Sequence, residues 1–156
     1  MYKQIGQVTF EEKWMTSNNT ENAPIKTTPL KLKIAVVDDS SFSRKTMIEI
    51  LEEDGHVVVG EASNAEMAIQ IAHTTSVDLF IIDVVMPEVS GIELMNALKD
   101  YKKKSFAYIL ISSLNVESVI IDAISGGAQD FISKPFDKND LLSSVNKIAQ
   151  NIENDK

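Results

Sequence analysis

The stretch Leu79-Phe80-Ile81-Ile82-Asp83 decides the fold, because four apolar residues are followed directly by a carboxylate. A short, continuous apolar run of this kind is typical of a strand buried on both faces of a parallel sheet. Met86-Pro87 and then Gly91 follow it closely. An aspartate at the end of such a strand lies at the carboxyl edge of the sheet, where open α/β sheets bind their ligands. We therefore expect the functional site to be built around Asp83.

Composition narrows the class of protein before any motif is considered. The chain has 156 residues, contains no cysteine and has a formal net charge of −8. This length predicts one domain with a core of ordinary size, and the absence of cysteine excludes disulfides and thiol chemistry. The acidic balance disfavours binding to nucleic acid, which needs a basic face. Because no segment has the apolar length of a membrane span or the core of a signal peptide, we expect a cytoplasmic protein without membrane insertion.

The first 29 residues differ in character from the rest of the chain. Residues 16–24 are polar and turn-prone, which is typical of a linker. We expect a flexible N-terminal extension over 1–29, one domain over 30–153 and a short C-terminal end over 154–156. Phe10 and Trp14 stand at helical i,i+4 spacing, so the alternative is that this aromatic pair docks on the domain or on a partner.

From residue 30 onward, segments of strand character alternate with segments of helix character. Strands are expected at 32–37, 57–61, 79–82, 108–111 and 130–133. Helices are expected at about 42–54, 65–72, 91–99, 116–125 and 137–151, with Ser40 or Ser41, Ser63 or Asn64, and Asp137 or Asn139 as candidate caps. This alternation predicts an α/β fold with a doubly wound, five-stranded parallel sheet in the flavodoxin-like order 2-1-3-4-5 and helices on both faces.

Polar side chains follow four of the five expected strands. The first strand is followed by Asp38 and Asp39, the third ends in Asp83, and the fourth and fifth lead to Ser112 and Lys134. Three carboxylates at one sheet edge repel one another and favour a hard divalent cation, for which Mg²⁺ is the natural candidate. A hydroxyl and an ammonium group suit the oxygens of a phosphoryl group. We therefore expect Asp83, at the centre of the sheet, to attack phosphorus, since carboxylates form aspartyl phosphates.

A Walker B strand is the alternative reading of an aspartate after four apolar residues. It requires a glycine-rich Gly-x-x-x-x-Gly-Lys-Ser/Thr loop, and the sequence contains none. Each polar residue taken alone is ordinary, since Asp-Asp after a strand is usually a helix cap. Their joint occurrence on successive strand ends is what favours a phosphoryl site.

With these residues in view, the chain from about residue 31 to 151 resembles a response-regulator receiver domain of the CheY type, the phosphorylated module of two-component signalling. The resemblance covers all but the N-terminal extension and the last few residues. The matching positions are Asp38-Asp39, Asp83 with Met86-Pro87 and Gly91, Ser112, Lys134-Pro135, and the surrounding run Gly127-Ala128-x-Asp130-Phe131-Ile132-x-Lys134-Pro135-Phe136.

The resemblance implies a phosphoacceptor and a metal site. Asp83 would accept a phosphoryl group from the phosphohistidine of a histidine kinase, or from a small donor such as acetyl phosphate. Asp39 and Asp83 would bind Mg²⁺ directly, Asp38 would bind it through water, and the backbone carbonyl of Val85 would complete the protein ligands.

It also implies a switch. Ser112 would be the switch hydroxyl and Phe131 the aromatic switch, while Lys134 would pair with the phosphate ahead of a cis peptide bond at Pro135. The alternatives are a spectator hydroxyl for Ser112 and a half-buried strand aromatic without a switching role for Phe131.

On this reading the protein is a stand-alone response regulator, and not an enzyme beyond catalysing its own phosphorylation and dephosphorylation. A histidine kinase or phosphotransfer protein would supply the phosphoryl group. The face formed by the fourth helix, the last strand and the last helix would then control a downstream protein in chemotaxis, motility or a phosphorelay. We expect a monomer or a weak, phosphorylation-dependent dimer.

Two alternatives belong to other functional classes. A phosphatase of the haloacid dehalogenase type also uses an aspartyl nucleophile beside Mg²⁺, but it needs a second carboxylate where this chain has Val85. A pseudo-receiver that acts as an unphosphorylated interaction scaffold is disfavoured by the intact set of polar residues.

Apolar Val85 and Leu114 further predict a slow loss of phosphate, because polar side chains at these positions could orient the hydrolytic water.

Overall fold

The structure is a computed structural model that describes residues 28–101 and 104–156. The predicted extension therefore lies almost wholly outside the described residues, as do Phe10 and Trp14. The elements in chain order are β1 (Lys33–Val37), α2 (Ser41–Glu53), β2 (Val57–Ala62), α3 (Ala65–Thr74), β3 (Leu79–Asp83), α4 (Gly91–Lys99), β4 (Ala107–Ser112), α5 (Glu117–Ser125), β5 (Asp130–Ser133) and α6 (Lys138–Asn154). None of the helices in these two ranges has the length and apolar character of a membrane span.

The five strands form one sheet in the order β2-β1-β3-β4-β5, and every neighbouring pair is parallel. The predicted fold class and strand order are thereby confirmed. All five residues of β3 are buried, as expected for the central strand of a sheet that is covered on both faces. The carboxyl ends of β1, β3 and β4 consequently meet at one edge of the sheet.

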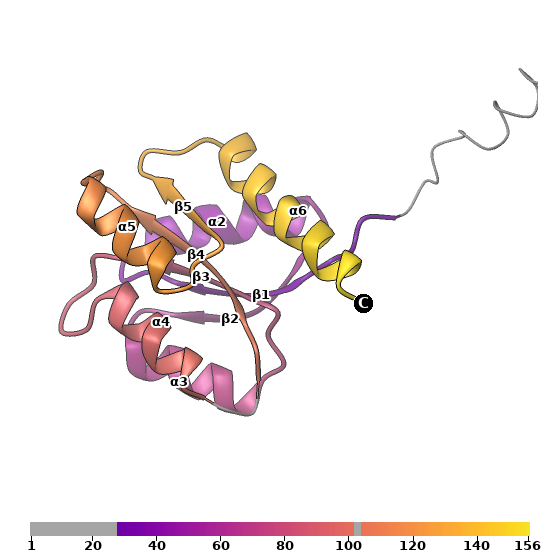
Figure 1. Cartoon of the computed structure of the whole chain (residues 1–156). Coiled ribbons are helices and arrows are strands. Elements are labelled where there is room, and N and C mark those ends of the chain that lie inside the picture. The colour runs from indigo at the N-terminus through magenta and orange to yellow at the C-terminus, as the bar shows by residue number, and fades with distance from the viewer. Residues whose placement is uncertain (1–27, 102–103) are drawn as a thin grey trace, which may run out of the picture.

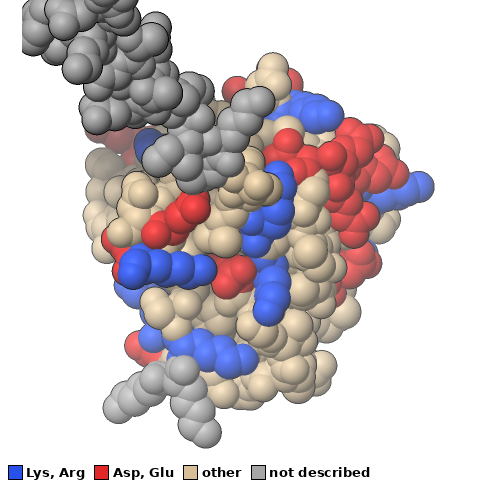
Figure 2. Space-filling model, turned by 90° about the vertical axis from the view of Figure 1, so that its right-hand side faces the viewer, with Lys and Arg blue, Asp and Glu red and all other residues tan. Residues whose placement is uncertain are grey.

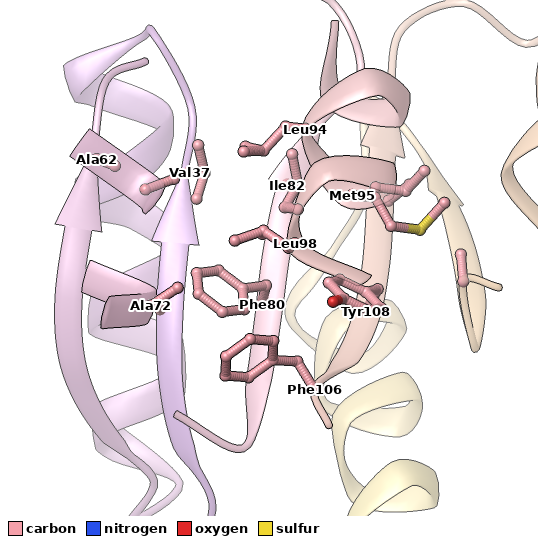
Figure 3. Close-up of a cluster of buried hydrophobic side chains, with 14 of the residues drawn as sticks. Val37, Ala62, Ala72, Phe80, Ile82, Leu94, Met95, Leu98, Phe106 and Tyr108 are labelled. Carbon is pink, nitrogen blue, oxygen red and sulfur yellow. The ribbon is translucent and has the colours of Figure 1, made fainter. Parts of the chain in front are cut away.

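Helices cover both faces of the sheet, with α2 and α6 on one side and α3, α4 and α5 on the other (Figure 1). Alternate residues of β3 face the two layers, so Leu79 and Ile81 pack toward α2 and α6. Phe80 packs on the opposite side, where its ring meets that of Phe106 edge-on at a centroid distance of 5.0 Å. Figure 3 shows this second cluster, in which Leu98 of α4 and Tyr108 of β4 lie around the two phenylalanine rings. The period-two pattern of the strand thus builds both halves of the core.

The structure identifies the N-cap residue of each helix for which the sequence had left two candidates. Ser40 caps α2, Asn64 caps α3, and Asp137 caps α6 in a reciprocal capping box with Asp140. Several helix boundaries differ from the prediction, by one to three residues. The α6 helix continues past residue 151 to Asn154, because Ile152 still packs on the core. The α5 helix begins at Glu117, with Val116 in the cap position and no side-chain cap bond.

Charged side chains of both signs lie on the face shown in Figure 2. Red groups form one continuous area at the upper right of this view, and blue groups lie mainly across its middle and lower left. A surface that carries charges of both signs is typical of a solvated protein face.

His56 is a buried titratable group outside the predicted site. Its side chain is fully buried, and Nδ1 accepts a hydrogen bond from the Leu32 N–H at 3.1 Å. A ring nitrogen that accepts from a backbone N–H is unprotonated, so Nε2 bears the hydrogen and donates to Asn146 Oδ1 at 3.2 Å. Burial lowers the pKa of His56, and the charge of Lys31 adds to this; together they outweigh Asn146 and Asp54, which raise it. The folded state therefore favours the neutral ring.

This environment predicts a loss of stability in mild acid. Below its ordinary pKa of about 6.5, His56 binds a proton in the unfolded chain but not in the folded one, so stability falls as the pH drops through this value. The fall continues until the lowered folded pKa is reached. We expect the melting temperature of a His56→Gln variant, which keeps an acceptor near Leu32, to fall less than that of the wild type between pH 7.5 and pH 5. Equal losses in the two proteins, measured by thermal unfolding, would contradict this assignment.

Candidate functional site

The turn after β1 and the last residue of β3 bring three carboxylates together. One oxygen from each of Asp38, Asp39 and Asp83 lies within 4.8 Å of the others. Asp38 and Asp83 are buried, whereas Asp39 is exposed to solvent. The sequence-based expectation that these residues converge agrees with this geometry. Asp39 is therefore the member of the cluster that is most open to water.

Asp83 is held at the end of β3 by the backbone on both sides of it. It pairs with Ile111 in the β3–β4 register, and the next residue, Val84, donates its N–H to the Ile111 carbonyl at 2.8 Å. The Val85 N–H donates to Asp83 Oδ1 at 3.2 Å. Asp83 Oδ1 is therefore held by the loop that follows the strand, and Oδ2 faces Lys134.

Asp38 is held by hydrogen bonds with the end of β2, the cap residue of α2 and Lys134. Its N–H donates to the Ala62 carbonyl at the end of β2 at 3.0 Å. Asp38 Oδ1 accepts the Ser40 N–H at 2.8 Å, and Oδ2 accepts from Lys134 Nζ at 2.9 Å. A carboxylate with both oxygens occupied has a fixed orientation at the sheet edge.

Lys134 links two of the carboxylates. In addition to its bond to Asp38, its Nζ lies 3.2 Å from Asp83 Oδ2. Its own N–H donates to the Ser112 carbonyl at 2.9 Å, which fixes the end of β5 beside the end of β4. The Lys134–Pro135 peptide bond is cis, as the resemblance implied.

Burial and charge act in opposite directions on this pair. Burial raises the pKa of Asp83 above its usual range, and the charge of Asp38 adds to this, while Lys134 and the Val85 N–H act to lower it. For Lys134, burial lowers the pKa, but its bonds to Asp38 and Asp83 and their charges outweigh burial and raise it. Lys134 therefore stays protonated and offsets part of the negative charge.

The donor set fits a hard divalent cation. Three carboxylates and one ammonium group leave two negative charges (−3 + 1 = −2), which one Mg²⁺ would neutralise. Mg²⁺ is bound by oxygen and keeps several waters, and the exposed position of Asp39 gives this cluster contact with solvent. Val85 lies next to the cluster, because its N–H donates to Asp83 Oδ1. That its backbone carbonyl binds the cation remains a prediction.

The two predicted switch residues flank the cluster differently. Ser112 is completely buried, and its Oγ accepts a hydrogen bond from the Leu114 N–H at 2.9 Å. The Ser112 proton therefore remains available to another acceptor. Phe131 is half-buried in β5 and packs against the core layer below α3, α4 and α5. Their switching roles stay predictions.

Arg44 is a residue at the site that the sequence analysis did not single out. It lies in α2, and its Nη1 donates to the Asp38 carbonyl at 2.7 Å. Its only local signal was a basic residue four positions after the cap Ser40, which is a common pattern on helices. The contact depends on how the chain turns back from β1 into α2, and the sequence pattern does not report that turn.

Together, the fold and the acidic edge define a doubly wound α/β domain of the kind used in phosphoryl signalling, and comparison with known proteins identifies the family. Residues 34–146 match the response regulator receiver domain. The chain is 37% identical to the chemotaxis protein CheY of Bacillus subtilis over 115 residues, which cover 74% of this chain and 95% of that protein. The chain therefore belongs to the response regulator receiver family, and its resemblance to CheY-type domains is confirmed.

Solved structures agree with this assignment. A CheY-like receiver domain from Methanospirillum hungatei shares the fold, with a TM-score of 0.75 at 21% identity over 81% of this chain and all of that one. CheY of Borrelia burgdorferi, solved as a CheX–CheY–BeF₃–Mg²⁺ complex, has a TM-score of 0.70 at 29% identity over 75% of this chain and 88% of that one. Because receiver domains are signalling modules of two-component systems, the phosphatase alternative is set aside.

Proposed function

We propose that this response regulator accepts a phosphoryl group on Asp83 from a histidine kinase or phosphotransfer protein, in a Mg²⁺-dependent reaction. Phosphorylation would switch the face formed by α5, β5 and α6, and this face would control a protein partner in chemotaxis, motility or a phosphorelay. The observation that supports the proposal most strongly is the bridge from Lys134 to Asp83 and Asp38 at the carboxyl edge of the sheet. The second candidate is an unphosphorylated scaffold, which would not need this charge arrangement.

The transfer exchanges one bond for another at phosphorus. A carboxylate oxygen of Asp83 forms the new O–P bond as the N–P bond to the donor imidazole breaks, and the imidazole nitrogen leaves with the bonding electrons. The Lys134 ammonium group lies where negative charge develops on the phosphoryl oxygens. When bound, Mg²⁺ would neutralise phosphoryl oxygens beside the carboxylates. Asp39 and Asp83, with Asp38 through water, are the residues that would hold it.

The aspartyl phosphate would change which hydrogen bonds form at this edge. It adds acceptor oxygens to Asp83, and the free proton of the Ser112 hydroxyl can be donated to one of them. Movement of Ser112 would release space beside β5, where Phe131 is only half-buried. The proposed switch therefore couples a local charge change to the packing of Phe131.

The surface beside α5 suits a protein partner. Leu114, Val116, Ile121 and Ile124 are each 46–53% exposed, on α5 and the loop before it. Exposed aliphatic groups gathered on one element favour apolar contact with another protein. The Borrelia burgdorferi CheY was solved in a complex with CheX, which supports the proposal that the output partner is a protein.

Val85 and Leu114 lead to a prediction about the lifetime of the phosphoryl group. Both side chains are exposed beside the site, and neither can orient a water for attack on the acyl phosphate. We expect a Val85→Asn, Leu114→Gln variant to lose phosphate at least about tenfold faster than the wild type, because polar groups position the water. Decay of the phosphorylated protein, followed by mass spectrometry, gives both rates. A wild-type half-life of only seconds would contradict the prediction.

The proposed function is tested with monophosphoimidazole, whose N–P bond is that of phosphohistidine. We expect Mg²⁺-dependent phosphorylation of the wild type, with amide NMR shifts in α5, β5 and α6 and smaller ones in α2 and β2. An Asp122→Asn variant, altered at an exposed residue of α5, should react like the wild type. Phosphorylation without shifts in α5, β5 and α6 would exclude the proposed switch, and no phosphorylation would favour the scaffold.

A further inference from the structure

Arg44 has an unusual environment for an arginine near a helix start. Its side chain is only 15% exposed, and its Nε is buried without a hydrogen-bond acceptor among residues 28–101 and 104–156. The carboxylate oxygen Oε1 of Glu61 lies 3.8 Å from this Nε, at the end of a side chain that is 57% exposed. Burying part of a guanidinium group without full pairing costs free energy. Its Nη1 donates a strong hydrogen bond to the Asp38 carbonyl, at 2.7 Å.

That hydrogen bond completes a clamp on the backbone of Asp38. The Asp38 N–H donates to the Ala62 carbonyl, and the Asp38 carbonyl accepts from Arg44. Both main-chain polar groups of this residue are therefore bonded to other elements, the end of β2 and the first turns of α2. The plane of the peptide that joins Asp38 to Asp39 is fixed as a result.

This peptide matters because the two acidic side chains beside it are supported unequally. The Asp38 carboxylate is held directly, by the Ser40 N–H and by Lys134. Asp39 projects into solvent, so the direction of its carboxylate depends chiefly on the backbone that precedes it. The Arg44 bond acts on that backbone.

We infer that Arg44 is a positioning residue for the metal site: it holds the Asp38–Asp39 turn so that the Asp39 carboxylate meets those of Asp38 and Asp83. Glu61 steadies the guanidinium group from the β2 side. Arg44 acts through the main chain and contacts neither the phosphoryl group nor the cation. The inference rests on the proposed function in one respect, namely that this cluster binds Mg²⁺.

The test is a Mg²⁺ titration of the full chain followed by amide NMR signals of residues 38–40 and 83–85. We expect Arg44→Met to raise the Mg²⁺ Kd about tenfold, the lower end of the usual effect of a residue that orients metal ligands. Arg44→Lys, which keeps one donor, should lie between this variant and the wild type. Lys45→Met, at the exposed neighbouring position, is the matched control and should bind as the wild type does.

A second measurement separates positioning from a purely structural role. At saturating Mg²⁺, we expect the rate of phosphorylation of Arg44→Met by acetyl phosphate to return to within about twofold of the wild type, because Asp83 and Lys134 are untouched. A lowered melting temperature with an unchanged Mg²⁺ Kd would overturn the inference. If Arg44→Met does not fold, Arg44→Gln, whose side chain is shorter, decides by the same criterion.

The outcomes distinguish this inference from the proposed function. If the wild type fails to bind Mg²⁺, the proposed function itself is wrong. If the wild type and Arg44→Met bind Mg²⁺ equally well, only the role of Arg44 is wrong.

Discussion

Replacing Lys134 with methionine is expected to slow phosphorylation of Asp83 by acetyl phosphate about 100-fold, the usual cost of removing one preorganised donor from a reacting oxyanion. The Lys134 ammonium group lies 2.9 Å from Asp38 Oδ2 and 3.2 Å from Asp83 Oδ2, so it lies beside the attacking carboxylate. Methionine has a similar length but no charge. In the methionine variant the two buried carboxylates face each other without a positive charge between them. A dianionic donor would therefore approach negative charge that no lysine offsets.

Lys138→Met is the matched control for this prediction. Lys138 forms an ion pair with Glu53 at 3.0 Å, but both side chains are more than half exposed, and an exposed pair of this kind contributes little. We expect the control to be phosphorylated at the wild-type rate. If Lys134→Met reacts within about threefold of the wild type at saturating Mg²⁺, the role given to Lys134 is wrong.

The second large effect is expected for Gly91→Ala, at the start of α4. A Cβ on Gly91 would lie against the Asp83 carbonyl oxygen, far inside van der Waals contact, and 2.9 Å from both the Asp83 carbonyl carbon and the Val84 Cα. These are backbone atoms of the loop that holds the phosphoacceptor, and Gly91 N–H already donates to the Val84 carbonyl at 2.9 Å. The neighbours therefore cannot move aside without distorting the site.

We expect Gly91→Ala to lower the free energy of unfolding by about 3 kcal/mol and the melting temperature by roughly 10 °C. Gly60→Ala is the comparison. The Cβ of Gly60 would meet side-chain atoms of Ile71 at 2.9–3.2 Å, and this side chain can shift more readily than backbone. Its loss of stability should be clearly smaller. Equal melting temperatures for Gly91→Ala and the wild type would show that the loop after β3 is less tightly packed than the structure indicates.

The sheet and its order could be predicted because their signals are local and repeated. The apolar run of β3 requires burial on both faces, and the alternation of strands and helices leaves few right-handed ways to wind the chain. The convergence of Asp38, Asp39 and Asp83 then follows from topology alone. The exact register of the strands was not needed for this prediction, because parallel neighbouring strands end at the same edge of the sheet.

Other features could not be predicted because they depend on contacts between distant residues. The sequence predicted that Lys134 binds a phosphoryl group. It did not predict that Lys134 Nζ forms ion pairs with both Asp38 and Asp83. The contact of Arg44 with the Asp38 carbonyl depends on a turn geometry that no short pattern encodes. The α6 helix ends at Asn154 and not at about residue 151, because Ile152 still packs on the core and such tertiary contacts supply most of the stability of a helix.

The phosphoacceptor role of Asp83 is the central feature of the proposed function. The measurement is intact mass after incubation with acetyl phosphate, with and without Mg²⁺, for the wild type and for Asp83→Asn. We expect one phosphoryl adduct on the wild type, only with Mg²⁺, and none on the variant. An adduct that persists on Asp83→Asn, or a folded wild type that forms none in the presence of Mg²⁺, would contradict the account.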